Sequence, residues 1–477
     1  MSEIPTLSFP RDIYDHSSRS LSATPARRDE ERKWTTPLAK QLTEAINTTG
    51  PVPLASYMRM CLTSDIGGYY TGAIEKDRDQ FGQKGDFITS PEISQVFGEL
   101  IGIWFVAEWM SQGRPKRGVE LIETIRNFKD MASSIDAVYM VEASKELRAT
   151  QKNLLCDADA SMRESKEGWH STCKYTHTPI VWTETINAVP QNASKTPFIV
   201  AHEFFDALPI HAFQVVEVPP TQQPPTTSGS PRSASSNTTS PTLQWREMVV
   251  SPTPAGATHA ELGTPKSEQH GPVPEFQMTL SRTATRHSLY VPESSPRYRA
   301  LKSTPGALIE VCPDAALYAS DFAARIGGTR QHPKRRPSGA ALVLDYGPAD
   351  TIPANSLRGI RRHRRVSPFA EPGLVDLSAD VDFTALAEAA TRASEGVEVH
   401  GPVEQAAFLE AMGVRQRAEA LARSAGDPDR ARAIERARRR LVDRGPDGMG
   451  KVYKALAILP ENGGRRRPVG FGGDVAA

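Results

Sequence analysis

The stretch PFIVAHEFFDALP, from Pro197 to Pro209, decides how the rest of the sequence is interpreted. It begins as an apolar run typical of a buried strand and continues directly into an acidic loop. Similar apolar runs occur along the chain: VELIE at 119–123, AVYMVEAS at 137–144, IVWTET at 180–185 and AALVLDYG at 340–347. Because helix-compatible segments separate these runs, we predict βαβ units, a mainly parallel sheet buried on both faces and an α/β fold.

The sequence around these runs indicates five parts. They are a disordered or targeting segment at 1–33, a helical N-terminal part at 34–113, the first half of the sheet at 114–210, an inserted β region at 211–312, and the second half of the sheet with C-terminal helices at 313–477. Within the inserted region, HAFQVVEV, LQWREMVV and EFQMTL are typical of antiparallel strands. Residues 219–242 between the first two are mostly Pro, Ser and Thr, so we expect a disordered loop there.

A long core helix is predicted before the first run. Thr89 or Ser90 suits its N-cap and Gly113 its C-terminal cap. Apolar residues repeat between them at helical spacing: Ile93, Val96, Phe97, Leu100, Ile101, Trp104 and Phe105. Near the other end of the chain, an Arg-rich helical stretch at 415–444 should be broken at Gly426 and Pro428, before a last strand at 452–459.

Acidic residues follow the predicted strands. Glu123 ends the first run, Glu142 the second, Glu203 and Asp206 follow the fourth, and Asp345 closes the fifth. In an open α/β sheet, ligands bind beyond the carboxyl ends of the strands, and an acid after the second strand commonly accepts the hydroxyls of a ribose. We therefore expect Glu142 to bind a ribose; the alternative is a solvated carboxylate that begins the helix SKELRATQ.

The Gly-rich turn that usually accompanies such an acid is missing. No glycine occurs between Gly118 and Gly168, and VELIE continues directly into TIRNFKDMASSID at 124–136. Those residues barely reach the dozen or so that a parallel crossover with its helix needs. The sequence thus has the strands of a nucleoside-binding sheet without the expected turn.

Composition excludes several classes of protein. The 477 residues include 57 Lys and Arg and 56 Asp and Glu, so the formal net charge is only +1. A chain with so little net charge has no overall positive potential to attract a polyanion, and we expect no nucleic-acid partner. The longest strongly apolar stretch, 96–110, is too short for a membrane span. Four cysteines without C-x-x-C spacing favour a reducing compartment. We expect no metal, because H-E-F-F-D at 202–206 lacks the second histidine of a zincin helix.

Several motifs in a fixed order identify a resemblance. They are GDFITSPEIS, FGELIGIWFVAEWM, VELIE, AHEFFDALPIHAFQ, WREMVV, EVCPDA, LDYG, LRGIRRHRRVSPFAEPG and DLSADVDFTAL. Together they strongly resemble the MidA family of mitochondrial protein arginine methyltransferases, which serve complex I assembly. The resemblance runs from about Trp34 to Leu459 and is interrupted by the Pro/Ser/Thr-rich loop.

The resemblance implies a class I, Rossmann-like methyltransferase sheet with S-adenosyl-L-methionine as cofactor. It also implies a mitochondrial matrix location and symmetric dimethylation of an arginine on a core subunit of complex I. By resemblance, Gly85, Asp86, Thr89 and Ser90 line the cofactor pocket.

A cationic arginine substrate needs carboxylates, and Glu203 and Asp206 are the candidates. The missing turn leaves two possibilities open. Either a glycine-containing stretch after Glu123 was lost from this sequence, or the chain is a noncatalytic assembly or binding factor of the same fold.

Overall fold

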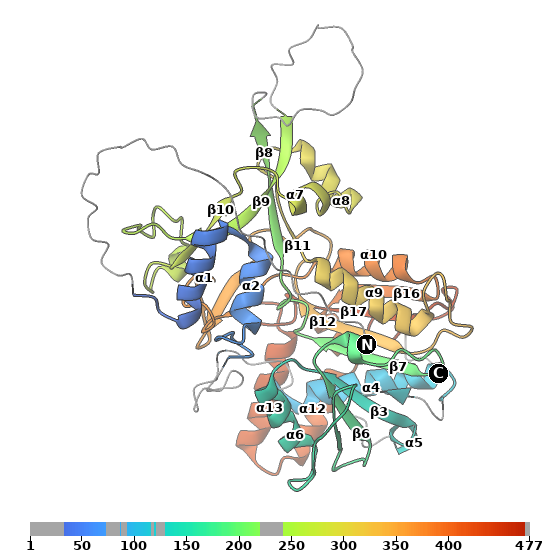
Figure 1. Cartoon of the computed structure of the whole chain (residues 1–477). Coiled ribbons are helices and arrows are strands. Elements are labelled where there is room, and N and C mark those ends of the chain that lie inside the picture. The colour runs from blue at the N-terminus through green and yellow to red at the C-terminus, as the bar shows by residue number, and fades with distance from the viewer. Residues whose placement is uncertain are drawn as a thin grey trace, which may run out of the picture. The chain divides into compact units, whose positions relative to one another are not determined.

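The computed structural model describes residues 33–72, 86, 93–115, 119–120, 129–219 and 242–472 (Figure 1). The chain separates into two units, Met1–Trp34 and Thr35–Ala477, and all elements below belong to the second. Several predicted features lie outside the described residues: the targeting or disordered segment as far as residue 32, the loop from 220 to 241, and Gly85, Thr89, Ser90 and Glu123.

A nine-stranded sheet forms the centre of the fold. Its order is β16-β17-β12-β7-β2-β3-β6-β5-β4. The strands are β2 (Val119–Glu120), β3 (Ile135–Val141), β4 (Arg163–Glu164), β5 (Trp169–Thr172), β6 (Pro179–Thr183), β7 (Thr196–His202), β12 (Ala340–Tyr346), β16 (Val397–Glu404) and β17 (Tyr453–Pro460). All five predicted apolar runs contribute a strand, which confirms the predicted sheet.

The direction of the strands defines the fold class. From β6 through β3, β2 and β7 to β12, neighbouring strands are parallel, whereas β17 runs antiparallel between β12 and β16. The chain passes from β2 to β3 on one side, and later places β7 on the other side of β2. Strand order therefore reverses at β2, and such a switch point is where open α/β sheets bind ligands.

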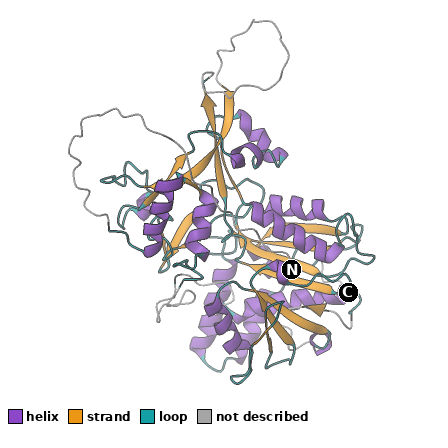
Figure 2. Cartoon of the chain, viewed as in Figure 1, coloured by secondary structure: helices purple, strands orange, loops and turns teal. Residues whose placement is uncertain are grey.

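Helices cover both faces of this sheet (Figure 2). On one face, α4 (Gln95–Ser111), α11 (Gln405–Ala411), α12 (Val414–Ser424) and α13 (Pro428–Val442) pack with Leu342 and Leu344 of β12. On the other, α9 (Pro313–Gly327) and α10 (Phe383–Ala393) pack with Ala341 and Val343. Residues 340–344 are all buried, which explains why the sequence shows a continuous apolar strand rather than an alternating one.

The core helix α4 begins later than predicted. Its first residue is Gln95, and the side chain of Ser94 accepts a hydrogen bond from the backbone N–H of Val96. The predicted apolar residues from Val96 to Phe105 are buried, and Gly113 beyond the helix end has a φ of +86°. The prediction of the helix and its core face is confirmed, while its N-cap is Ser94.

A second, antiparallel sheet contains the strands predicted for the inserted region. Its path is β1-β9-β8-β11, and β10 also pairs with β9. The strands are β1 (Val52–Pro53), β8 (His211–Val218), β9 (Thr242–Pro252), β10 (Phe276–Leu280) and β11 (Leu308–Val311). The helices α1 (Pro37–Thr49) and α2 (Leu54–Thr63) lie beside this sheet, and Gly50 is the C-cap of α1 (Figure 1).

A third sheet has the order β14-β13-β15, formed by β13 (Arg358–Arg361), β14 (Arg364–Val366) and β15 (Asp376–Ser378). The sequence DLSADVDF suggests a helix start, but its first three residues are β15, and α10 begins only after Asp382, whose side chain caps it. The remaining short elements are α5 (Lys129–Ala132), α6 (Lys145–Leu155), α7 (Arg286–Tyr290), α8 (Pro296–Ala300), η1 (Ile186–Ala188), η3 (Lys266–Glu268) and η4 (Leu301–Ser303).

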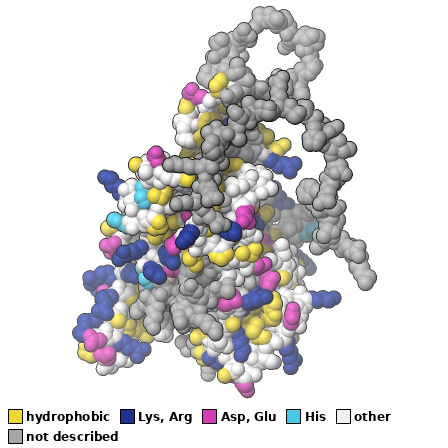
Figure 3. Space-filling view, turned by 60° about the vertical axis from the view of Figure 1, so that its left-hand side comes forward, with side chains coloured by type: hydrophobic (Ala, Val, Ile, Leu, Met, Phe, Trp, Pro, Cys, Tyr) yellow, Lys and Arg dark blue, Asp and Glu magenta, His cyan; other side chains and the backbone are white. Residues whose placement is uncertain are grey.

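The Arg-rich segment forms two helices, α12 and α13, with Gly426 and Pro428 at the break as predicted. Figure 3 shows Lys and Arg side chains interspersed with Asp and Glu on the visible face. Among the described residues, no helix is both long enough and apolar enough to cross a membrane.

Candidate active site

Acidic residues gather at the carboxyl edge of the large sheet. Glu142 directly follows β3, Glu203 and Asp206 follow β7, and Asp345 is the penultimate residue of β12. Because β3, β7 and β12 run in the same direction, these residues share one edge. The edge also contains the switch point at β2, where a ligand is expected.

Glu142 is held in place by α6, the helix that follows it. Its Oε1 accepts a hydrogen bond from the backbone N–H of Ser144 at 2.9 Å, and its Oε2 accepts one from Nε2 of Gln151 at 3.2 Å. Oε1 of Gln151 in turn accepts a bond from the indole of Trp182 at 2.9 Å. Burial raises the pKa of Glu142, although these bonds oppose the shift. The carboxylate is therefore oriented before any ligand arrives.

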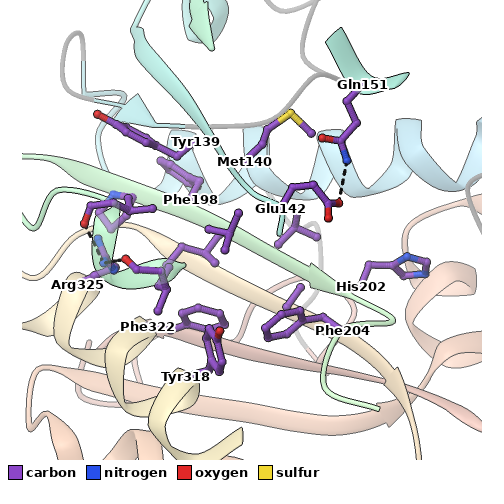
Figure 4. A pocket seen from close by; sticks show the side chains of 17 residues that line it. Tyr139, Met140, Glu142, Gln151, Phe198, His202, Phe204, Tyr318, Phe322 and Arg325 are labelled. Carbon is purple, nitrogen blue, oxygen red and sulfur yellow. Dashed lines mark hydrogen bonds between the residues drawn. The ribbon is translucent and has the colours of Figure 1, made fainter. Parts of the chain in front are cut away.

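A cavity of about 290 Å³ lies beside β3 and β7, the two strands that flank β2 (Figure 4). Its lining is largely aromatic and aliphatic: Tyr139, Met140, Phe198, Phe204, Tyr318 and Phe322. Glu142 and Gln151 contribute polar groups to the same lining. Small-molecule sites begin at about 300 Å³ and combine apolar walls with a few polar groups, so the cavity suits an aromatic ring with a polar substituent.

Two other polar residues of this lining, Arg325 and His202, are not free to bind a ligand as cations. Arg325 donates hydrogen bonds to the carbonyls of Ile186, Val189 and Pro190. Burial lowers the pKa of His202 to about 4, so its imidazole is neutral at pH 7. Neither group supplies a free charge to a ligand.

Asp345 fixes the loop that follows β7. Its side chain is 0% exposed, and its Oδ2 accepts the backbone N–H groups of Phe204 at 3.1 Å and Phe205 at 2.9 Å. Burial raises the pKa of Asp345 well above its ordinary value, and the charge of Asp206 adds to the shift. Since its oxygens already bind the backbone, Asp345 positions the loop.

Asp206 lies at the centre of a buried polar network. Its Oδ2 accepts a hydrogen bond from the hydroxyl of Tyr346, while its Oδ1 has no hydrogen-bond partner among the described residues. The guanidinium of Arg358 stacks over the Tyr346 ring, 4.3 Å from its centroid. Burial raises the pKa of Asp206, whereas Tyr346 and Arg358 lower it. One buried oxygen of Asp206 thus has no hydrogen-bond partner among the described residues.

Asp86, predicted from the family resemblance, lies close to this network. Its carboxylate accepts hydrogen bonds from the Tyr69 hydroxyl at 2.9 Å and the backbone N–H of Arg362 at 2.8 Å. Asp376 lies nearby and accepts a bond from the Tyr70 hydroxyl at 2.9 Å. Burial and then the charges of Asp206 and Asp86 raise the pKa of Asp376 to about 7. The described part of the chain therefore gathers several carboxylates here.

Glu203 has an unusual backbone conformation. Its φ is +48°, in the left-handed region that residues other than glycine rarely adopt, and its N–H donates to the carbonyl of Leu344 at 3.0 Å. Its Oε1 lies 3.2 Å from Nε2 of His202. Backbone strain of this kind, about 1–3 kcal/mol, clusters at functional sites. The residue marks the sharp turn from β7 into the acidic loop.

Sequence reasoning did not predict Tyr346, Arg358 and Asp376 as part of this site. Tyr346 directly follows Asp345, which was predicted, so its place in the sequence could have indicated that it belongs to the site. The sequence around Arg358 suggests a solvated or partner-facing basic cluster and that around Asp376 a helix start, and no local pattern brings either to β7.

Comparison with known proteins gives the family. The pattern of one family, described as "Putative S-adenosyl-L-methionine-dependent methyltransferase", matches residues 100–403. The chain belongs to this methyltransferase family. The match includes β2, β3, β7 and β12, and therefore the whole acidic edge of the sheet.

Relatives of this methyltransferase extend over most of its length. Protein arginine methyltransferase NDUFAF7 of Rattus norvegicus is 32% identical over 447 residues, which cover 90% of this chain and 86% of the relative. The Drosophila melanogaster homologue is 33% identical, covering 89% and 85%, and the Homo sapiens protein is 31% identical, covering 90% and 86%. All three relatives are described as mitochondrial, and the sequence resemblance is confirmed.

Solved structures agree on the fold. A crystal structure of a Burkholderia thailandensis protein bound to S-adenosyl-homocysteine matches with a TM-score of 0.58 and 21% identity, covering 92% of this chain and 93% of the other. A native crystal structure from the same organism matches with the same TM-score. The predicted methyltransferase fold is confirmed.

S-adenosyl-L-methionine is the cofactor of this methyltransferase family, and the described residues fit part of it. The oriented carboxylate of Glu142 suits the ribose, and the neighbouring aromatic cavity suits the adenine ring. Residues 121–128, which would contain the missing turn and which include Glu123, lie outside the described residues. The described part of the crossover to β3 contains only the four-residue helix α5.

Proposed function

We propose that this chain is a mitochondrial matrix protein arginine methyltransferase that dimethylates an arginine of a complex I core subunit symmetrically. The names of the relatives support arginine as the methylated residue and mitochondria as the location. The observation that carries the proposal is the carboxylate of Asp206, which is buried beside the switch-point edge with one oxygen unpaired among the described residues. A guanidinium is the cationic group whose planar N–H donors match such a carboxylate.

The cofactor side of the site is assigned to Glu142 and the cavity. When bound, S-adenosyl-L-methionine supplies an electrophilic methyl group. Glu142, already oriented by Ser144 and Gln151, would accept the ribose hydroxyls through its oxygens. The rings of Tyr139, Phe198 and Phe204 would exclude water from the base.

The substrate side is assigned to Glu203 and Asp206. Methyl transfer is an in-line displacement, so the protein must above all position the attacking nitrogen. Asp206 Oδ1 would accept a guanidinium N–H, while Tyr346 keeps Oδ2 in a fixed orientation. Asp345 accepts hydrogen bonds from the two backbone N–H groups between Glu203 and Asp206. These bonds fix the loop and therefore the positions of both candidate carboxylates.

Asp86 would support the cofactor pocket by joining Tyr69 to the turn at Arg362. Gly85, Thr89, Ser90 and Glu123 keep their cofactor-binding assignment as part of the same proposal. The inserted β region, with β8, β9 and β10, is assigned to the protein substrate rather than to the cofactor, since it lies apart from the parallel sheet.

A noncatalytic assembly factor of the same fold is the second candidate. It is favoured by the crossover from β2 to β3, which spans residues 121–134 without a glycine. Glycines let the backbone approach a bound nucleoside closely, so their loss weakens cofactor binding first. Glu142, Glu203, Asp206 and Asp345 lie at this edge in the described residues, which favours the enzyme.

The experiment that tests the proposal compares matched carboxylate variants. Glu203→Gln and Asp206→Asn each keep the side-chain shape and remove one charge, and Glu164→Gln, which changes an exposed residue of β4, serves as the control. With mitochondrial protein as substrate, methylarginine formation should fall in the two site variants and stay unchanged in the control. Equal formation in all three would refute the assignment of the substrate site.

A further inference from the structure

A cluster of three potential metal ligands lies in the second sheet, away from the acidic edge. His211 begins β8, Glu247 lies within β9, and His287 lies on α7. Their ligand atoms all lie within 4.8 Å of one another. Nδ1 of His211 is 2.8 Å from Oε1 of Glu247, and Nδ1 of His287 is 3.3 Å from the same oxygen.

The three residues come together because of strand register. Glu247 lies opposite Phe213 in the antiparallel pair β8–β9, so His211 is its diagonal neighbour on the same face. The helix α7 then brings His287 over this pair, with the two imidazole rings 4.3 Å apart. Residues from three elements thus converge on one carboxylate.

The carboxylate of Glu247 is deeply buried and has a nitrogen or oxygen partner at each of its two oxygens. Its side chain is 0% exposed. Both imidazole rings face Oε1, and Oε2 accepts a hydrogen bond from the hydroxyl of Thr285. A buried carboxylate needs such partners, and those at Oε1 are nitrogens that can also bind a metal ion.

We propose that His211, Glu247 and His287 bind a divalent transition-metal ion, with Zn²⁺ as the preferred ion. Two imidazole nitrogens and one carboxylate oxygen are a common ligand set for zinc. Zinc bonds of about 2.0–2.2 Å place ligand atoms roughly 3–3.5 Å apart, so a small movement of His287 completes the set. Thr285 orients the carboxylate through its other oxygen.

The exposure of the histidines shows how an ion enters. The side chain of His287 is 44% exposed, whereas that of His211 is 11% exposed. The ion therefore reaches the site past His287 and keeps a coordination position for water on that side. Binding would join β8, β9 and α7, and so stabilise the second sheet.

The experiment uses the full chain, free of any histidine tag, treated with a chelator and titrated calorimetrically with Zn²⁺. His287→Ala removes the exposed ligand and leaves Glu247 with His211 and Thr285, so the fold should persist. His332→Ala, an exposed histidine of a loop in the large-sheet half of the chain, is the matched control. Thermal unfolding of each metal-free variant shows whether it has kept its fold.

We expect one equivalent of Zn²⁺ to bind, with affinity at least tenfold weaker in His287→Ala and unchanged in His332→Ala. Co²⁺ should give an absorption spectrum of nitrogen and oxygen coordination that His287→Ala abolishes. Failure of Zn²⁺ to bind, or equal affinity in His287→Ala and the unmodified chain, would overturn the proposal. The two histidines would then serve only as hydrogen-bond partners of Glu247. Methyl transfer is not measured, so the result is independent of the proposed function.

Discussion

The hydroxyl of Tyr346 donates a hydrogen bond to Oδ2 of Asp206 and leaves Oδ1 of the same carboxylate without a partner among the described residues. Tyr346 ends β12 and Asp206 lies in the loop after the adjacent strand β7. The contact therefore couples the ends of two parallel strands, and it fixes the carboxylate that we assign to the substrate guanidinium.

Asp206→Asn should lower single-turnover methyl transfer by about a hundredfold, or about 3 kcal/mol of transition-state stabilisation. The reason is that the amide keeps the bond to Tyr346 but loses the charge that faces the guanidinium. Cofactor affinity, measured calorimetrically on the same variant, should change little. If the variant transfers methyl groups at the unmodified rate, Asp206 does not hold the guanidinium, and Glu203 is the remaining candidate.

Glu142→Gln should weaken cofactor binding and leave the rate of methyl transfer nearly unchanged, which is the opposite of the effect expected for Asp206→Asn. A neutral amide accepts ribose hydroxyls less well than a carboxylate, so the affinity for S-adenosyl-L-methionine should fall about tenfold, or about 1.4 kcal/mol. The transfer rate at saturating cofactor should be nearly unchanged. Glu164→Gln, an exposed residue on β4, is the control. Unaltered affinity in Glu142→Gln would show that the ribose binds elsewhere.

Asp376 should make stability depend on pH. Burial and the charges of Asp206 and Asp86 raise its folded pKa from 3.8 to about 7, so the folded state binds the proton more tightly than the unfolded state. Its contribution to stability is therefore present below about pH 4 and is lost as the pH rises towards 7, by up to about 1.4 kcal/mol per unit.

Asp376→Asn should remove this loss. Chemical unfolding at pH 5 and pH 8 should show that the variant gains stability relative to the unmodified chain as the pH rises. Asp350→Asn, which changes an exposed aspartate, should show no such trend. If both variants follow the same pH profile, Asp376 is not the titrating group.

The 477-residue chain should bind S-adenosyl-L-methionine weakly, because no glycine occurs between Gly118 and Gly168. Inserting a glycine-containing turn between Glu123 and Thr124 should strengthen binding at least tenfold by calorimetry. Resequencing the transcript across codons 118–130 should reveal such a stretch. Micromolar affinity in the chain without the insertion would show that another segment replaces the turn.

The large sheet could be predicted because its strands are buried on both faces. Continuous apolar runs such as 340–344 are typical of strands inside a parallel sheet, and Glu142 and Glu203 follow such strands directly. The parallel direction of the strands then predicts that these acids share an edge.

Other parts of the site could not be predicted in this way. Asp376 reaches Asp206 only through the third sheet, and DLSADVDF resembles a helix start because Asp382 does cap a helix six residues later. Likewise, the sequence predicts Thr89 or Ser90 as the N-cap, whereas α4 begins after Ser94. Contacts between residues distant in sequence, such as Tyr346 with Asp206, depend on tertiary packing rather than local pattern.

We propose that this chain transfers methyl groups from S-adenosyl-L-methionine to arginine. The most direct measurement incubates it, with and without the inserted turn, with methyl-labelled cofactor and mitochondrial protein, and identifies the labelled residue by mass spectrometry. We expect label on arginine in the form with the turn, and Asp206→Asn should reduce that label about a hundredfold. Absence of label from both forms, or label on a residue other than arginine, would contradict it.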